Sequence, residues 1–143
     1  MMVSTKGRYA LRILVDLAEH QTGAYIPLKE IAERQDISEK YLESILKILV
    51  KNRLLQGLRG KGGGYLLSKK PEDITVGAVL RMTEGTLAPV TCLEENAEQC
   101  PRMADCRTLT LWKNLNQVIN QYLDSVTLAD LMQTQEMGND YVI

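Results

Sequence analysis

The three cysteines of this 143-residue chain, Cys92, Cys100 and Cys106, lie in one short window, and there are no others. Thiolates are soft ligands for metals and iron–sulfur clusters, and a thiol with a depressed pKa is also a redox nucleophile. The N-terminus lacks the apolar segment of a signal peptide, and an odd cysteine count without one favours a metal-binding, redox-active or inert set over a disulfide framework. The spacing alone does not decide among these alternatives.

The composition is that of an ordinary globular protein, with 45% hydrophobic and 24% charged residues. A chain of this length suits one domain, or a small domain with an appended element, and buries a core without disulfides. No apolar run approaches the ~18 residues of a membrane span, so we expect a cytoplasmic protein with no membrane partner.

The charges are divided between the two halves of the chain. Residues 1–70 contain 13 Lys and Arg against 7 Asp and Glu, a formal charge of +6, whereas residues 71–143 contain 4 against 11, a formal charge of −7. A basic module suits a polyanion, because phosphate neutralisation supplies most of the non-specific affinity for DNA. Chance segregation of charges between helices is the alternative.

The basic half contains the pattern of a helix-turn-helix. Apolar residues at helical spacing predict helices over 5–20, 27–35 and 39–52. Pro27 starts the second helix, and Ser38 is a good N-cap for the third. The third helix has a regular inward stripe, formed by Leu42, Ile45, Leu46 and Leu49. Two short helices joined by a tight turn place the second of them in a DNA major groove.

A glycine-rich hairpin follows the third helix. Two β-prone runs, 54–58 and 65–68, flank the segment RGKGGG, whose glycines permit a tight turn. Arg59 and Lys61 fall at its tip, where a winged helix inserts a cationic side chain into a narrow minor groove. The alternative, a phosphate-binding loop, does not match, because Lys61 precedes the glycines and no Ser or Thr follows it.

The acidic half predicts helices on both sides of the cysteines. The first covers 75–85 and the second 108–126, and Thr127 with Asp130 forms an approximate capping box for a last short helix. The second helix has a 3.5-residue apolar repeat typical of a coiled-coil seam, at Trp112, Leu115, Ile119, Tyr122 and Val126. We expect it to be the axis of a homodimer, because such a module needs a second copy to reach adjacent half-sites. An internal core helix is the alternative.

These elements predict a mainly α fold with a small β-hairpin wing, that is, a winged helix-turn-helix domain plus a long dimerisation helix. The expected parts are a DNA-binding domain over 1–83, a cysteine-containing sensor loop over 84–107, the dimerisation helix and a terminal short helix over 108–133, and a flexible tail over 134–143.

A family resemblance rests on three stretches: STKGRYALRILVDLA, ISEKYLESILKILVKN and RGKGGGYLLSKKPEDITVGAVLRMTEG. They resemble the Rrf2 family of bacterial transcriptional regulators, over a match from about Ser4 to about Gln133. The resemblance implies a homodimer that grips a pseudo-palindromic operator in double-stranded DNA with two winged domains, and no enzymatic activity. It also implies control, with repression as the expected mode, of genes for iron–sulfur or cysteine and sulfur metabolism.

The resemblance also assigns DNA contacts. The major-groove residues would be Ser38, Lys40, Tyr41, Glu43 and Ser44, and Arg59 would enter the minor groove. Glu43 occupies the discriminating position, where a carboxylate can accept a hydrogen bond from cytosine N4. The phosphate contacts, which orient the protein without reading sequence, would be Lys6, Arg8, Lys47, Lys51 and Lys61.

Iron–sulfur members of the family carry three cysteines in this same loop, so the resemblance implies a 2Fe–2S or 4Fe–4S cluster on the three thiolates. The match is incomplete, because the first gap is longer than usual. Leu109 and Arg8 also stand where family members have a histidine or an acidic residue as fourth ligand. The fourth ligand is therefore unidentified, with Asp105, Glu94, a water or a small thiol as candidates. Redox-active thiols and inert cysteines are the alternatives.

The chain closes with Asp140, Tyr141, Val142 and Ile143, which resemble the C-terminus of serine acetyltransferases. In those enzymes the terminal isoleucine enters the active site of cysteine synthase, and cysteine-metabolism repressors of the Rrf2 family end similarly. The resemblance implies cysteine synthase as a partner, and the alternative is a short, silent tail.

Two further functions compete with a DNA-binding regulator. An iron–sulfur or thiol redox protein without a regulatory role is disfavoured, because His20 is the one histidine and the chain has no catalytic constellation or cofactor fingerprint. A protein-interaction adaptor that has lost DNA binding is disfavoured by Arg59 and by the basic first half.

Overall fold

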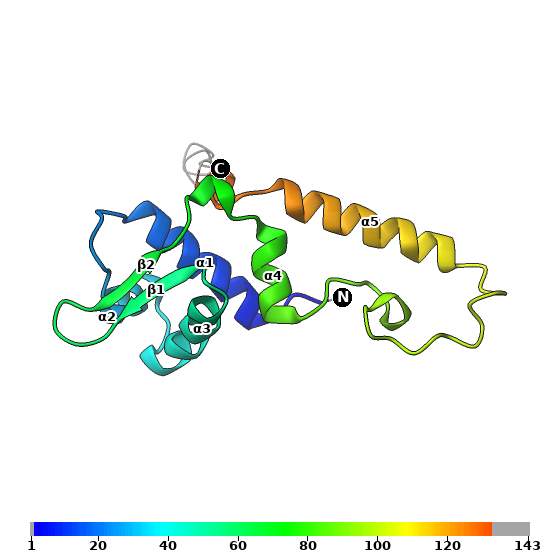
Figure 1. Ribbon diagram of the computed structural model, residues 1–143, viewed down its shortest axis with the longest axis horizontal. Coiled ribbons are helices and arrows are strands. Elements are labelled where there is room, and N and C mark those ends of the chain that lie inside the picture. Colours follow the sequence, from blue (N-terminus) through cyan, green and yellow to red (C-terminus); the bar gives the residue numbers. More distant parts are fainter. Residues whose placement is uncertain (1, 133–143) are drawn as a thin grey trace, which may run out of the picture.

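The computed structural model describes residues 2–132. It is mainly helical with one two-stranded antiparallel sheet, which confirms the predicted fold class. The elements are α1 (Thr5–Glu19), α2 (Leu28–Gln35), α3 (Glu39–Lys51), β1 (Leu55–Leu58), β2 (Gly64–Leu67), η1 (Pro71–Asp73), α4 (Val76–Glu84), η2 (Thr91–Leu93) and α5 (Leu109–Ser125). A further short helix covers 128–132. The wing lies at one end of the molecule, and α5 runs away toward the other (Figure 1). Within residues 2–132, every helix falls short of the length and hydropathy that a bilayer crossing demands.

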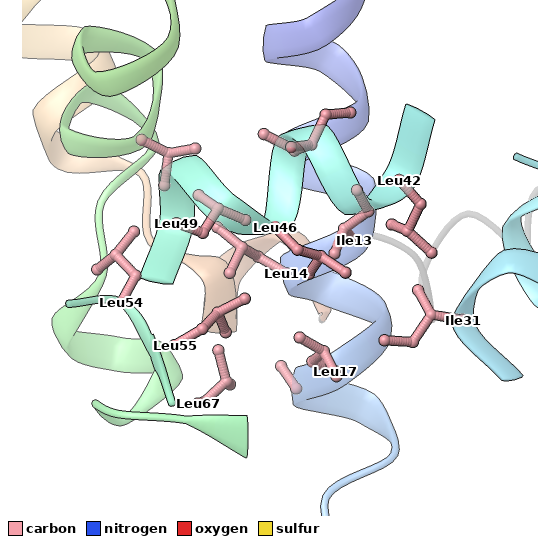
Figure 2. Close-up of a cluster of buried hydrophobic side chains, with 14 of the residues drawn as sticks. Ile13, Leu14, Leu17, Ile31, Leu42, Leu46, Leu49, Leu54, Leu55 and Leu67 are labelled. Atoms are coloured by element: carbon pink, nitrogen blue, oxygen red, sulfur yellow. The ribbon is translucent and has the colours of Figure 1, made fainter. Parts of the chain in front are cut away.

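The helix-turn-helix is built on a core of leucine and isoleucine. The predicted inward stripe of α3 is buried and faces α1, while the two strands close one side (Figure 2). Burying each such side chain contributes about 1.5–3 kcal/mol, so the three helices form one rigid unit. The fully buried side chains of these helices are Ile13, Leu14, Leu17, Ile31, Leu42, Ile45, Leu46 and Leu49.

Side-chain caps mark the start of several helices, among them α1, α3 and α4. The Oγ of Ser38 accepts a hydrogen bond from the backbone N of Tyr41 at 3.2 Å, as expected for the N-cap of α3. Thr127 and Asp130 cap each other, with backbone N to side-chain oxygen distances of 3.0 and 3.1 Å. Pro27 is the N-cap of α2 rather than its first residue, because its extended backbone lies outside the helix.

The base of the wing is fixed by hydrogen bonds to the loop before α2. In the β1–β2 hairpin Leu58 lies opposite Gly64, and Tyr65 exchanges two backbone hydrogen bonds of 2.9 and 2.8 Å with Ile26, in the loop before α2. Gly64, at φ 148°, lies so close to the Ile26 carbonyl that a side chain would overlap it. The wing tip, residues 58–62, is exposed. The hairpin is therefore fixed where it leaves the core and open to solvent at its end.

The long helix α5 packs on α4. Arg81 Nη1 pairs with Asp124 Oδ1 at 2.7 Å, and Arg81 Nη2 donates to Asn120 Oδ1 at 2.7 Å. Gly77 permits the close approach, because a Cβ at this position would overlap the Asp124 carboxylate. A second small core joins the two helices and the loop after α4, and consists of Val76, Leu80 and Leu87 with Ile119, Leu123 and Val126.

Candidate nucleic-acid interface and cysteine loop

The outward face of α3 carries the residues expected at the major groove. Four of them are exposed and Tyr41 is half-buried; the exposed ones are Ser38, Lys40, Glu43 and Ser44. The hydroxyl of Ser44 donates to the Tyr41 carbonyl at 2.6 Å. The face therefore presents a mixture of hydrogen-bond donors and acceptors, which is what reading base edges requires.

Tyr41 is held in place from α1. Its ring packs edge-on against Tyr9, with centroids 5.8 Å apart and an interplanar angle of 74°. The guanidinium carbon of Arg12 lies 4.8 Å from the Tyr9 ring centroid on the ring's face. Aromatic and cation–π contacts of this kind contribute roughly 0.5–1.5 kcal/mol each. The orientation of Tyr41 on the recognition helix is thus coupled to α1.

The wing and α3 meet around Tyr65 of β2. Burial raises the pKa of Tyr65, the negative charge of Glu43 raises it further, and the positive charge of Arg59 lowers it. The phenol therefore lies within electrostatic reach of both the recognition helix and the wing tip. Arg59 and Lys61 are exposed, and Glu43 also forms a solvated ion pair of 3.8 Å with Lys47. The charges of Glu43 and Arg59 thus both act on this half-buried tyrosine.

The remaining basic candidates differ in their surroundings. Lys51 is exposed at the end of α3, and Lys6 is half-buried in the first turn of α1. Arg8 donates to the hydroxyl of Thr5, one turn earlier, at 3.2 Å. Contacts to phosphate need a cation within reach rather than one exact geometry, so such surface positions remain suitable.

A buried carboxylate between α1 and α2 was not anticipated from the sequence. Asp16 is 3% exposed and is the one buried charged residue in the described part of the chain. Its hydrogen bond raises the pKa of Arg34, from the end of α2, against the opposing effect of burial. The available signal was the position of Asp16 on the inward side of α1, beside Ile13 and Leu17, where an apolar residue is the rule.

The apolar residues of α5 form two faces. Among those expected at a dimer seam, Ile119 packs on its own chain and Trp112 is half-buried. The outward face, which we name the α5 stripe, consists of Leu111, Leu115, Val118 and Tyr122, with exposures of 56, 38, 60 and 66%. The α5 stripe contains Leu115 and Tyr122 of the sequence repeat together with Leu111 and Val118, which the repeat did not include. A 3.5-residue spacing fits either face of the helix.

The cysteine loop lies at the far end of the molecule from the wing tip (Figure 1). Its three cysteines are free and half-buried. Within residues 2–132, no three His, Cys, Asp or Glu side chains converge into a group that could hold a metal ion. Three thiols are chemically suited to an iron–sulfur cluster, but the described loop does not gather them around one point.

Cys106 has a neighbour that changes its chemistry. Its Sγ lies 3.5 Å from the hydroxyl of Thr108, immediately before α5. The hydrogen bond to the Thr108 side chain, with backbone hydrogen bonds from Thr108 and Leu109, lowers the pKa of Cys106, and burial opposes this shift. A thiol with a lowered pKa is a better nucleophile at neutral pH and a readier metal ligand.

The four residues expected to bind cysteine synthase lie outside the described residues: Asp140, Tyr141, Val142 and Ile143. Their assignment depends on the sequence alone.

Comparison with known proteins shows extensive sequence similarity to one family. The family model described as "Rrf2: Iron-dependent Transcriptional regulator" matches residues 3–134. Protein rrf2 of Nitratidesulfovibrio vulgaris is 44% identical over 133 residues, which cover 93% of this chain and 88% of that protein. The HTH-type transcriptional regulator IscR of Serratia proteamaculans is 39% identical over 137 residues, which cover 96% of this chain and 82% of that protein.

Solved structures agree with the sequence relationship. CymR (YrzC), the global cysteine regulator of B. subtilis, superposes with a TM-score of 0.75 at 36% identity, covering 94% of this chain and 98% of that one. IscR of T. potens superposes with a TM-score of 0.74 at 36% identity, covering 96% and 90%. The predictions that the chain is a regulator and not an enzyme are confirmed. The chain belongs to the Rrf2 family of DNA-binding transcriptional regulators.

Proposed function

We propose that two copies of this chain bind one pseudo-palindromic operator as a homodimeric repressor, with each α3 in the major groove and each wing in the neighbouring minor groove. The observation that carries the proposal is that α3 exposes Ser38, Lys40, Glu43 and Ser44 while the wing tip exposes Arg59 and Lys61. Polar groups on α3 suit base edges, and the cationic wing tip suits the electronegative minor groove.

The α5 stripe supports assembly from two copies. Four exposed apolar side chains along one face of a helix are the pattern that a partner helix buries in a coiled-coil seam. A two-fold pair would also space two α3 helices for half-sites one turn of DNA, roughly 34 Å, apart.

For the signal, we propose that the cysteine loop sets operator affinity and that the target genes serve iron–sulfur or cysteine and sulfur metabolism. Support comes from the three thiols ahead of α5 and from relatives described as an iron-dependent regulator and a global cysteine regulator. Cys92, Cys100 and Cys106 would be the ligands of an iron–sulfur cluster, which supplies reversible one-electron chemistry when bound. Changes in the loop would reach the winged domain through α5 and its seat on α4.

Direct thiol oxidation is a second candidate signal. The lowered pKa of Cys106 favours it, because the thiolate is the form that oxidants attack. The tail is a third candidate input, in which Asp140–Ile143 would dock into cysteine synthase.

A selection from random duplexes, followed by footprinting, tests the DNA-binding mode. Arg59→Ala should lower affinity for the selected duplex tenfold or more, because a minor-groove contact is lost. Lys113→Ala, which removes an exposed lysine of α5, is the control and should change it less than twofold. Equal affinities for Arg59→Ala and the native protein contradict the role of the wing.

Purification without oxygen tests the signal. Visible absorption with stoichiometric iron and sulfide, lost in each Cys→Ser variant, supports the cluster. Iron-free protein whose operator affinity changes with thiol oxidation supports the redox alternative.

Titration with cysteine synthase tests the tail, and undiminished binding after deletion of Ile143 rules out the tail as the anchor.

A further inference from the structure

Asp16 is a buried carboxylate with no place in the DNA contacts proposed above. Its side chain is 1% exposed, on the inward side of α1. Taking a carboxylate out of water costs several kcal/mol unless an opposite charge and hydrogen bonds compensate for the lost hydration. The partners of Asp16 therefore indicate what this group does in the fold.

The carboxylate holds the last two residues of α2. Arg34 donates to it from Nε at 3.0 Å and from Nη2 at 2.8 Å, and Gln35 donates from Nε2 at 2.9 Å. A guanidinium that donates from two nitrogens fixes orientation as well as distance. The end of α2 is thus held against α1 at a defined angle.

Arg12, one turn before Asp16, holds Gln35 a second time. Its Nη2 donates to the Gln35 carbonyl at 2.6 Å, and its Nε donates to Gln35 Oε1 at 3.1 Å. That carbonyl is among those that a helix end leaves without an intrahelical partner. The backbone, the amide oxygen and the amide nitrogen of Gln35 are therefore all bonded to α1.

The turn after Gln35 leads directly into the recognition helix. Asp36 adopts the left-handed conformation, at φ 53° and ψ 52°, which costs a residue other than glycine roughly 1 kcal/mol. Ser38, the N-cap of α3, follows two residues later. The buried core holds α3 against α1 and α2. Because so little chain separates Gln35 from α3, the hold on Gln35 also helps to set where α3 begins and how it is oriented.

We propose that Arg12, Asp16, Arg34 and Gln35, here named the α1–α2 clamp, position α3 for sequence recognition. The inference rests on the proposed placement of α3 in the major groove. Hydrogen bonds to base edges weaken steeply with small changes in distance and angle, whereas long basic side chains follow phosphates through a small rotation. Loosening the clamp lowers affinity for the operator more than affinity for unrelated DNA.

Two clamp variants and one matched control test this inference. Arg34→Lys keeps the charge but loses the two-nitrogen contact, and Gln35→Ala removes the amide. Glu30→Gln alters the exposed partner of the same guanidinium, 3.5 Å away, and leaves the clamp intact. The probes are the best duplex that the native protein selects from a random pool and a shuffled duplex of the same composition.

Both clamp variants should bind the selected duplex at least tenfold more weakly and the shuffled duplex within twofold of native, and Glu30→Gln should change neither affinity. Thermal unfolding identifies any variant that is not folded at the assay temperature, in which case the other clamp variant decides. An unchanged ratio of the two affinities in a folded clamp variant overturns the inference, whether neither affinity changes or both fall by the same factor. A native protein that selects no duplex contradicts the proposed function itself, and the inference falls with it.

Discussion

The reactivity of a single residue, Cys106, depends on its neighbour Thr108. The Thr108 hydroxyl, 3.5 Å from its Sγ, lowers the pKa of Cys106, so the thiolate is populated at a lower pH than in an ordinary cysteine. The thiolate is the form that ligates metal and the form that oxidants attack. Both proposed uses of the loop therefore depend on the same hydrogen bond.

Replacement of Thr108 by Val, in a Cys92→Ser/Cys100→Ser background, removes the hydroxyl and keeps the side-chain volume. Thr108 makes no side-chain hydrogen bond to the start of α5, so the helix should be retained. We expect the pH profile of Cys106 alkylation by iodoacetamide to move to higher pH, because losing the hydrogen bond raises the pKa. Thr110→Val, at an exposed position in α5, should leave the profile unchanged. Superimposable profiles for Thr108→Val and its background would refute the role of the hydroxyl.

Among the elements, α5 has two apolar faces with different partners. One face packs on α4, and the α5 stripe is exposed. Val118→Glu puts a charge in the middle of the stripe and leaves the α4 contact untouched. Self-association should weaken roughly hundredfold or more, because each copy would bury an unpaired carboxylate. Sedimentation equilibrium measures this, with Gln117→Glu on the neighbouring exposed face as control; a native mass for Val118→Glu would mean that another surface joins the copies.

The contact of α4 with α5 predicts that Asp124→Ala has opposite effects on the free energy of unfolding in two backgrounds. In the native chain, Asp124→Ala removes a partly exposed ion pair and should lower the free energy of unfolding by less than about 1 kcal/mol. In a Gly77→Ala background the same change should raise it, because the new Cβ otherwise overlaps the Asp124 carboxylate. Urea unfolding of the four proteins checks the reversal, and additive effects would argue against the overlap.

For the whole molecule, the division of charge governs DNA binding. The first 70 residues carry +6 and the remainder −7, so we expect the basic wing and helix-turn-helix to face DNA and the acidic half to be repelled by it. Binding should fall linearly on a plot of log affinity against log salt concentration. Lys61→Ala should reduce the magnitude of the slope by about 1 per lost phosphate contact, hence by about 2 for two copies, whereas Lys113→Ala should not change it. A slope equal to native for Lys61→Ala would show that this lysine touches no phosphate.

Local sequence signals were sufficient to predict the main elements and the inward face of α3, but not the two faces of α5. Ser38 and Thr127 act on backbone three residues away, and the turn glycines of the wing lie between the two strands that they join. The starts of these helices and the hairpin could therefore be predicted from short stretches. The two faces of α5 share one periodicity, and only packing on α4 distinguishes them. Asp16 accepts hydrogen bonds from Arg34, eighteen positions away, and no local pattern indicates this pairing. The cysteine loop lacks periodicity altogether, so its path could not be predicted.

The contrast between the locked root and the open tip of the wing has an evolutionary consequence. Gly64 and the Ile26–Tyr65 bridge tolerate little change, whereas Leu58, Arg59 and Lys61 at the tip are exposed, and substitutions at such positions usually alter stability by less than about 0.5 kcal/mol. Groove preference can therefore drift at the tip while the scaffold is conserved. Descendants of one ancestral regulator would thereby acquire new operators while they keep the same fold.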